Sequence, residues 1–370
     1  MLAKFKVENF KGFRIPIELN FCSSKGYTFN QSSVNNGVLK NIIIYGENGV
    51  GKSNLGLGIF DIVAHLTEKN INERQYLHYV NAYSSDLEVT FEYEFVFNGT
   101  KVYYKYVKSG LRDILSEELL IDDAICAQID RRISNQAFIN LKGAESLNKG
   151  LPGTQLSLLK YIKNNSVLEN DHSNRVFAEF YEFVEKMLFF RSVDNNMYLG
   201  YQEGSRSIGL DIIERGNVKD LQDFLCRAGI KCEIDVAEDV DKKVLVFKFD
   251  GKFIGFFDIA STGTKSLTLF YYWLQRIRTK NEISFVFIDE FDAFYHFELS
   301  AFIVNELKNI GVQFILTTHN TTIMSNDLLR PDSYFIMSKS VIKNIPQSTE
   351  KEIREAHNLE KMYRSGSFNE

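Results

Sequence analysis

Proline, cysteine and long apolar runs are all scarce in this chain of 370 residues. Four prolines leave no proline-rich linker, and four scattered cysteines without a C-x-x-C pair argue against a disulfide scaffold or a zinc ribbon. No apolar run approaches the roughly 18 residues of a transmembrane helix. We therefore expect a globular protein of one large or two closely joined domains, in the cytoplasm with reduced thiols and with no membrane partner.

A strong charge of one sign is also missing. The 43 Lys and Arg residues are balanced by 48 Asp and Glu residues, which gives a net charge of −5. Because binding to DNA or RNA depends on several contacts between basic side chains and phosphates, this balance does not favour a nucleic-acid partner. Short basic stretches, such as Arg131 with Arg132, keep local binding of nucleic acid as an alternative.

Alternating apolar residues indicate antiparallel strands. Residues 5–21 alternate with period two and predict two neighbouring edge strands. Residues 87–107 and 244–259 each predict a β-hairpin, with turns at Asn98-Gly99 and Asp250-Gly251. A half-buried sheet face explains the many aromatic residues of the first hairpin more simply than base stacking does.

Continuous apolar runs indicate a second kind of strand. The segments 38–45, 283–289, 312–318 and 333–337 are short, apolar and separated by helical patterns, as in a parallel sheet covered on both faces. The predicted fold is therefore α/β, with an antiparallel β subdomain. We divide the chain into an N-terminal lobe (1–110), an inserted, mainly helical lobe (111–235), a C-terminal lobe (236–340) and a helical tail (341–370).

A glycine-rich loop joins the first of these apolar strands to a helix. It matches the phosphate-loop pattern G-x-x-x-x-G-K-[ST], in which backbone N–H groups surround phosphate oxygens at a helix N-terminus. Lys52 would neutralise the phosphates, and Ser53 would bind Mg²⁺. The expected nucleotide-binding residues of the loop are Gly46, Glu47, Asn48, Gly49, Val50, Gly51, Lys52, Ser53 and Asn54.

Two later apolar strands end in polar residues. Asp289 and Glu290 end one of them, and open α/β sheets bind ligands at the carboxyl ends of their parallel strands. Asp289 would hold Mg²⁺, and Glu290 would polarise the attacking water as a catalytic base. A solvated strand end is the alternative for this acid pair. His319 follows the next strand, where it would contact the γ-phosphate.

The order of these motifs resembles a known family. The segments ENFKGF (8–13), GENGVGKS (46–53), ASTGTKSL (260–267), FVFIDEFDAFYH (285–296) and ILTTHN (315–320) follow one another as in the ABC-type P-loop ATPase heads of the RecF, SMC and OLD group. The chain is more closely similar to the bacterial abortive-infection and phage-defence ATPases of that group, including the ATPase component of PARIS-like systems.

The resemblance implies roles for particular residues. Ser261, Gly263 and Thr264 would form the signature motif, which acts in trans on the γ-phosphate bound by a second subunit. Asn9 and Lys11 would approach the nucleotide from the first strand. His296 would lie in the D-loop region, and Gln136 is the candidate for the Q-loop. With ATP and Mg²⁺ as cofactors, the implied catalytic residues are Glu290, Lys52 and His319, and the implied metal ligands are Ser53 and Asp289.

The resemblance also implies a function. ATP-bound heads would pair into a homodimer or a higher homo-oligomer, and would sense infection and control a separately encoded effector, a nuclease or another toxin, in anti-phage defence. Residues 320–370 are too few for a fused nuclease, because a typical domain needs roughly 100 residues. A RecF-like DNA-binding repair ATPase and a scaffold in which ATP is structural are the alternatives.

Overall fold

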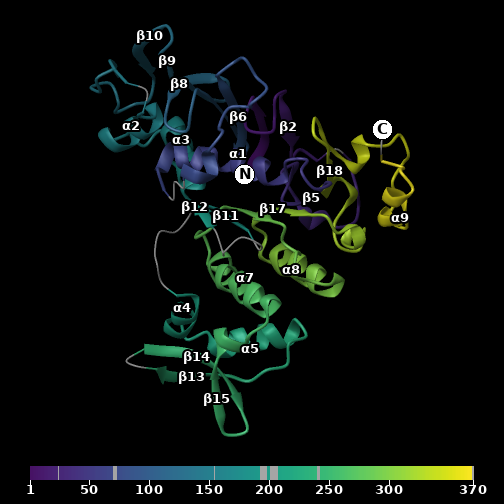
Figure 1. Ribbon diagram of the computed structural model, residues 1–370. Helices are drawn as coiled ribbons and strands as arrows, with labels where there is room; N and C mark the ends of the chain where they lie inside the picture. Colours follow the sequence, from purple (N-terminus) through teal and green to yellow (C-terminus); the bar gives the residue numbers. More distant parts are fainter. Residues whose placement is uncertain are drawn as a thin grey trace.

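The computed structural model describes residues 1–23, 25–69, 73–153, 155–191, 198–200, 207–239 and 242–368. In these residues the strands form an antiparallel sheet, a mainly parallel sheet, a three-stranded sheet and one short pair (Figure 1). The antiparallel sheet lies in the upper part of Figure 1, the parallel sheet in the middle and the three-stranded sheet at the bottom.

The antiparallel sheet has the strand order β10-β9-β8-β7-β6-β1-β2. Strand β1 pairs with both β2 and β6, so it is an internal strand and not the edge strand that the alternation predicts. The hairpin at Asn98-Gly99 is confirmed, since both residues have positive φ. The strands are β1 (Leu2–Glu8), β2 (Ile17–Asn20), β6 (Val89–Phe97), β7 (Thr100–Lys108), β8 (Ile114–Ile121), β9 (Ala124–Asp130) and β10 (Ser134–Ile139).

The second sheet has the order β12-β11-β16-β17-β5-β18-β19, and its five inner strands run parallel. Each predicted apolar segment contributes a strand to it, which confirms the α/β fold, although Val38 and Leu39 of the first segment form a separate short strand. Its strands are β5 (Asn41–Tyr45), β11 (Met187–Arg191), β12 (Tyr198–Gly200), β16 (Phe285–Asp289), β17 (Gln313–Thr318), β18 (Tyr334–Met337) and β19 (Ile342–Asn344). Strands β3 (Val34–Asn35) and β4 (Val38–Leu39) form the short pair.

Helices cover both faces of the parallel sheet. Residues Ile42 and Ile44 of β5 face the core that contains α1, whereas Ile43 faces the core that contains α7 and α8. Helix α1 packs so closely that a Cβ at Gly56 would lie 2.7 Å from the rings of Phe189 and Phe287. The helices of the two outer layers are α1 (Lys52–Thr67), α7 (Thr262–Arg278) and α8 (Phe297–Ile310).

The inserted lobe (111–235) is predicted to be mainly helical, but it contains strands as well as helices. Residues 114–139 form β8, β9 and β10, which extend the antiparallel sheet. Segment 114–121 is rich in Leu and Glu, which favour helices, but its alternating burial and its pairing with β7 and β9 decide the structure. The helices of the lobe are α2 (Leu158–Asn165), α3 (His172–Glu185), α4 (Ile208–Glu214) and α5 (Val218–Arg227).

The hairpin at Asp250-Gly251 and the tail also differ in part. Strands β14 (Lys242–Phe249) and β15 (Lys252–Gly255) form the hairpin, and β14 also pairs with β13 (Ile234–Asp239), but residues Phe256–Ile259 form the short helix α6. The tail is predicted to be helical. As far as residue 368, it contains the strand β19, a 3₁₀ turn at Ile345–Gln347 and the short helix α9 (Leu359–Arg364). Asn326 donates hydrogen bonds to the carbonyls of residues 354, 355 and 357, which holds this segment in turns.

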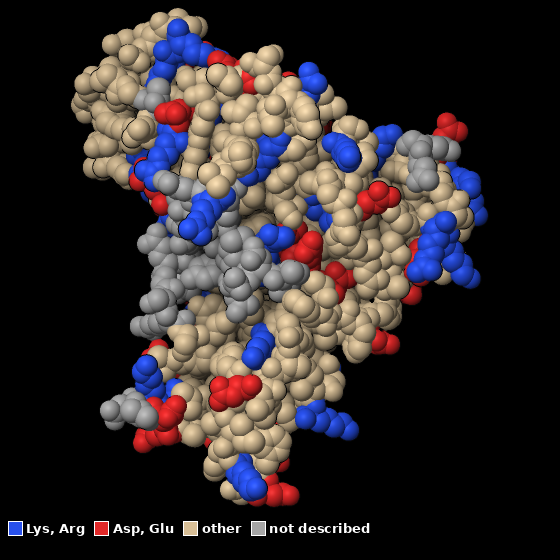
Figure 2. Space-filling view, in the orientation of Figure 1, with Lys and Arg blue, Asp and Glu red and all other residues tan. Residues whose placement is uncertain are grey.

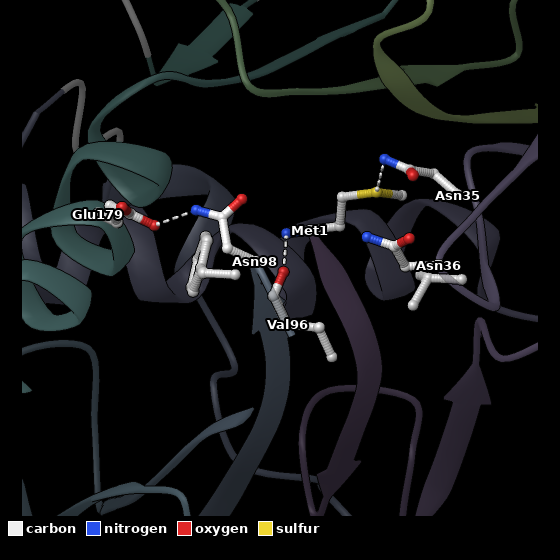
Figure 3. Close-up of a pocket in the computed structure, with 8 residues that line it drawn as sticks. Met1, Asn35, Asn36, Val96, Asn98 and Glu179 are labelled. Atoms are coloured by element: carbon white, nitrogen blue, oxygen red, sulfur yellow. Dashed lines mark hydrogen bonds between the residues drawn. The ribbon is translucent and has the colours of Figure 1, made fainter. Parts of the chain in front are cut away.

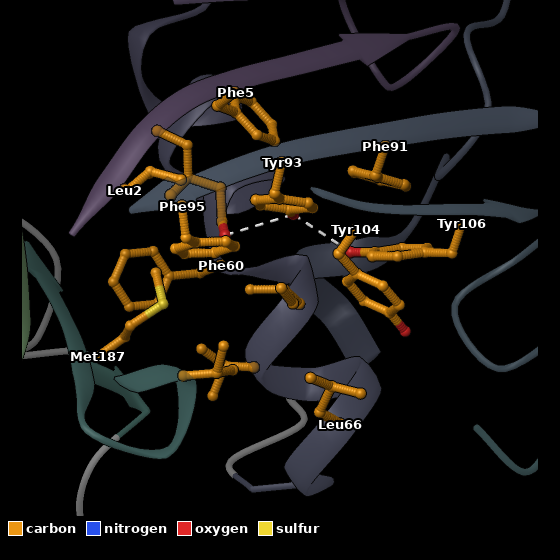
Figure 4. Close-up of a cluster of buried hydrophobic side chains, with 14 of the residues drawn as sticks. Leu2, Phe5, Phe60, Leu66, Phe91, Tyr93, Phe95, Tyr104, Tyr106 and Met187 are labelled. Carbon is orange, nitrogen blue, oxygen red and sulfur yellow. Dashed lines mark hydrogen bonds between the residues drawn. The ribbon is translucent and has the colours of Figure 1, made fainter. Parts of the chain in front are cut away.

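A buried polar network joins α1 to the antiparallel sheet. Figure 4 shows the aromatic side chains of β6 and β7 directed at α1, as the half-buried sheet face predicts. Among them, Lys108 Nζ lies 2.7 Å from Asp61 Oδ2, and both side chains are at most 1% exposed. Tyr79 and Tyr106 donate hydrogen bonds of 2.7 and 3.0 Å to the same carboxylate. The charge of Asp61 is therefore fully compensated inside the core.

Candidate functional site

The phosphate loop connects β5 to α1 in the conformation that glycine permits. Gly49 and Gly51 have φ values of 77° and 109°, and a Cβ at Gly51 would lie 2.8 Å from the ring of Phe13. Helix α1 begins directly after Gly51 without a side-chain hydrogen bond to its first N–H groups. The free N–H groups and the positive end of the helix dipole make this turn suitable for an anion such as phosphate.

Lys52 lies inside the loop. Its Nζ donates to the carbonyls of Gly46 and Glu47 at 2.7 and 3.1 Å, and lies 3.2 Å from Nδ1 of His319. Burial lowers the pKa of Lys52, while the negative charges of Asp289 and Glu290 oppose this shift. A bound phosphate would add a further negative charge and favour the ammonium form.

Asp289 is a buried carboxylate at the end of β16. Ser53 Oγ, from the first turn of α1, donates a 2.6 Å hydrogen bond to Asp289 Oδ2, and Thr317 Oγ1 from β17 donates a 2.7 Å bond to Oδ1. The fold therefore brings together the two predicted metal ligands, Ser53 and Asp289, although they are far apart in sequence. Both are oxygen ligands, which Mg²⁺ prefers.

Glu290 and His319 lie beside this pair. Glu290 has a φ of 51°, so the chain turns sharply after β16 and the side chain is 29% exposed. Its Oε1 lies 3.8 Å from Nε2 of His319, whose other ring nitrogen faces Lys52. A partly exposed carboxylate next to the phosphate loop can accept a proton from water. His319 connects the lysine to this acid.

The first loop of the chain lies against the phosphate loop. A Cβ at Gly12 would lie 3.1 Å from the side chain of Asn54, and Phe13 touches Gly51. Lys11 donates to the carbonyl of Leu77 at 3.1 Å, and burial lowers its pKa. Asn9 is buried and donates to two backbone carbonyls, so it holds the loop in place.

The residues of the expected signature motif begin α7. Ser261 Oγ accepts a hydrogen bond of 3.1 Å from the N–H of Thr264 and so caps the helix. Gly263 lies beside the carbonyl of Phe294, in the segment that follows the acid pair. His296 at the end of that segment is the N-cap of α8. These residues stand at the start of a different helix from the phosphate loop.

Arg191 and Asp292 are two site residues that the sequence analysis missed. Arg191 ends β11, and its Nε lies 3.0 Å from Asp289 Oδ2. Asp292 is buried and accepts a 2.7 Å hydrogen bond from Thr318, and burial raises its pKa. An arginine directly after the apolar run 187–190 was the available signal. The Q-loop candidate Gln136 instead stands in β10, at the outer edge of the antiparallel sheet.

The pocket in Figure 3 lies elsewhere. It has a volume of about 170 Å³, and its lining includes Met1, Asn98 and Glu179 but no residue of the phosphate loop. The amino group of Met1 donates to the carbonyl of Val96 at 2.7 Å beside it. The pocket is smaller than the roughly 300 Å³ at which small-molecule sites begin, so we assign no ligand to it.

The described residues contain neither a preformed metal cluster nor a membrane-spanning helix. Across the described part of the chain, no group of three or more His, Cys, Asp or Glu side chains could hold a metal ion. A divalent ion at Ser53 and Asp289 would therefore need further ligands from a nucleotide and from water. None of the described helices has the length and apolar character needed to cross a membrane.

Comparisons with known proteins identify one family. A family model described as AAA domain, putative AbiEii toxin, Type IV TA system, matches residues 42–325. No curated protein matches the chain. Among solved structures, the SmcHead bound to the C-winged helix domain of ScpA is 12% identical, covers 93% of this chain and 96% of its own, and gives a TM-score of 0.48. The SMC head domain from Thermotoga maritima is 15% identical, covers 93% and 98%, and gives a TM-score of 0.44.

Proposed function

The chain belongs to this family of AAA domains, and we propose that it is a Mg²⁺-dependent ATPase whose ATP-bound heads associate and control a separately encoded toxic effector in anti-phage defence. The observation that carries the ATPase assignment is the meeting of Lys52, Asp289, Glu290 and His319 around the phosphate loop. These side chains come from the ends of two adjacent strands, β16 and β17, and from the first turn of α1, so one bound nucleotide could contact them all.

The nucleotide phosphates would be held by the loop Gly46–Asn54. Lys52 would neutralise them, and Lys11 lies on the neighbouring loop. Ser53 and Asp289 would hold Mg²⁺, which would supply electrostatic stabilisation of the charge that develops on the phosphates. Glu290 would accept a proton from the attacking water. His319, whose two ring nitrogens face Lys52 and Glu290, would hold these two side chains in position.

The proposed role in defence rests on the family. Its description names a toxin of a type IV toxin-antitoxin system, which supports a relation to abortive infection, as in the PARIS-like ATPases. Ser261, Gly263 and Thr264 at the start of α7 would contact the nucleotide of a second copy. On the face drawn in Figure 2, Lys and Arg occur as separate spots between Asp and Glu, which favours a protein effector over nucleic acid. The four free thiols suit the cytoplasm.

Replacing Lys52 by alanine tests nucleotide binding. We expect the affinity for a fluorescent ATP analogue to fall by about 10- to 150-fold, because charge-assisted hydrogen bonds contribute roughly 1.5–3 kcal/mol. Lys219→Ala is the matched control, since Lys219 is 74% exposed and pairs only locally on α5 with Asp223. Equal affinities of the Lys52→Ala and wild-type proteins would refute the phosphate-loop assignment.

ATP-dependent association tests the proposed assembly. We expect the mass of the Glu290→Gln protein, measured by light scattering, to rise at least to that of a dimer with ATP and Mg²⁺. Ser261→Asp in this background should abolish the rise, because its carboxylate would repel the partner's γ-phosphate, although Asp is as good a helix cap as Ser. Ser261→Asn is the control, because asparagine also caps a helix but carries no charge. The protein with this substitution should still associate.

The same measurement separates the alternatives. A protein that stays monomeric with ATP and assembles only when duplex DNA is added would favour a RecF-like repair ATPase. A multimer of constant mass that binds ATP without hydrolysing it would favour a scaffold. Equal association of the Ser261→Asp and Ser261→Asn proteins would show that the start of α7 does not face a nucleotide.

A further inference from the structure

Arg191 occupies an unusual place next to Asp289. Strand β11 runs parallel to β16, and Arg191 is the direct partner of Asp289 in the register of the two strands. The guanidinium Nε lies 3.0 Å from Asp289 Oδ2, and the side chains are 24% and 0% exposed. Asp289 thus has a positively charged partner that is supplied by the chain itself.

The same carboxylate oxygen also accepts the hydrogen bond from Ser53. Oδ2 of Asp289 lies 2.6 Å from Ser53 Oγ and 3.0 Å from Arg191 Nε, while Oδ1 accepts from Thr317. Both oxygens of Asp289 are therefore engaged, and the two candidate metal ligands are joined to each other directly. A cation that binds Ser53 and Asp289 must loosen these contacts.

A buried carboxylate needs one compensating cation, but two cations at the same oxygen repel each other. Removing the partner of a buried charge is strongly unfavourable, so Asp289 needs Arg191 as long as no metal is bound. A divalent cation in the same place would meet the guanidinium at a few ångströms, where like charges repel strongly in a poorly hydrated site. Binding of Arg191 and binding of a metal are therefore antagonistic.

We propose that Arg191 is an internal counterion that competes with Mg²⁺ for Asp289 and sets the Mg²⁺ concentration at which the site becomes occupied. This inference rests on the proposed nucleotide site. Arg191 is a positioning residue. In the metal-free protein it keeps Asp289 in contact with Ser53. When Mg²⁺ and nucleotide bind together, it moves away from Asp289.

The first test measures the Mg²⁺ concentration that nucleotide binding requires, and it does not depend on ATP turnover. A fluorescent, non-hydrolysable ATP analogue is titrated with Mg²⁺ on the wild-type, Arg191→Gln and Arg191→Lys proteins. We expect Arg191→Gln, which loses the charge, to need about tenfold less Mg²⁺ for half-saturation. Arg191→Lys keeps the charge and should stay within about threefold of the wild type. If the Arg191→Gln protein needs as much Mg²⁺ for half-saturation as the wild type, or more, the proposal is overturned.

A second measurement needs no folded Arg191→Gln protein. In wild-type protein labelled with ¹⁵N-arginine, the side-chain Nε–H resonance that is missing in Arg191→Lys belongs to Arg191. This resonance should shift when Mg²⁺ and the analogue are added together, and should stay in place with the analogue and EDTA. An unchanged resonance in the Mg²⁺-bound complex would overturn the counterion role but leave the ATPase proposal standing. Wild-type protein that binds no analogue at any Mg²⁺ concentration would overturn both.

Discussion

Replacing Glu290 by glutamine should lower ATP turnover by about 10²- to 10⁴-fold, the usual contribution of a general base, while ATP binding persists. The amide has nearly the same shape as the carboxylate but cannot accept a proton from water. The backbone of Glu290 has a φ of 51° and donates to Thr317 Oγ1, and neither feature depends on the carboxylate. Single-turnover phosphate release and retention of radiolabelled ATP are the measurements.

Glu298→Gln is the matched control for this variant. Glu298 lies in the first turn of α8, and its side chain is 78% exposed. The same change of charge there should leave turnover within about twofold of the wild type, because exposed surface substitutions have small effects. Turnover of the Glu290→Gln protein that matches this control would remove Glu290 from the catalytic role and leave the proton acceptor to another group.

Replacing Lys108 by methionine should lower the free energy of unfolding by about 3–5 kcal/mol, because Asp61 would keep a buried charge without its cation. The Nζ of Lys108 lies 2.7 Å from Asp61 Oδ2 and also over the rings of Tyr79 and Tyr106. The remaining hydroxyl hydrogen bonds from the two tyrosines compensate only part of the charge. The midpoint of urea unfolding gives the loss.

Two further variants make this prediction specific to the charge. Lys105 lies on the same strand, but its side chain is 39% exposed and its Nζ is 3.9 Å from Glu92, so Lys105→Met should change stability by about 1 kcal/mol or less. Adding Asp61→Asn to Lys108→Met should recover part of the lost stability, since it removes the uncompensated charge. A Lys108→Met protein as stable as Lys105→Met would refute the stabilising role of the ion pair between Asp61 and Lys108.

The local sequence was sufficient to predict the strand, loop and helix around Lys52 and the polar strand ends at Asp289 and His319. Each of these features is encoded in fewer than about twenty consecutive residues, as a change of hydrophobic period next to a glycine loop. The parallel sheet follows from the same pattern, because apolar strands between helices need cover on both faces.

The missed features depend on contacts between distant segments. Arg191 follows the short run 187–190 within a region that was predicted to be a helical insertion, and only the pairing of β11 with β16 brings it to Asp289. Strand β8 contains residues that favour helices, and its neighbours in the sheet override that preference. The pairing of Asp61 with Lys108 likewise exists only because α1 packs on β7.

Helix α1 packs tightly against both large sheets. At Gly56 it rests directly on the rings of Phe189 in β11 and Phe287 in β16, and farther along the helix Asp61 forms an ion pair with Lys108 of β7. Tyr181 of α3 donates a further hydrogen bond to the carbonyl of Leu66. Helix α1 therefore links the phosphate loop at its N-terminus to both sheets through buried contacts.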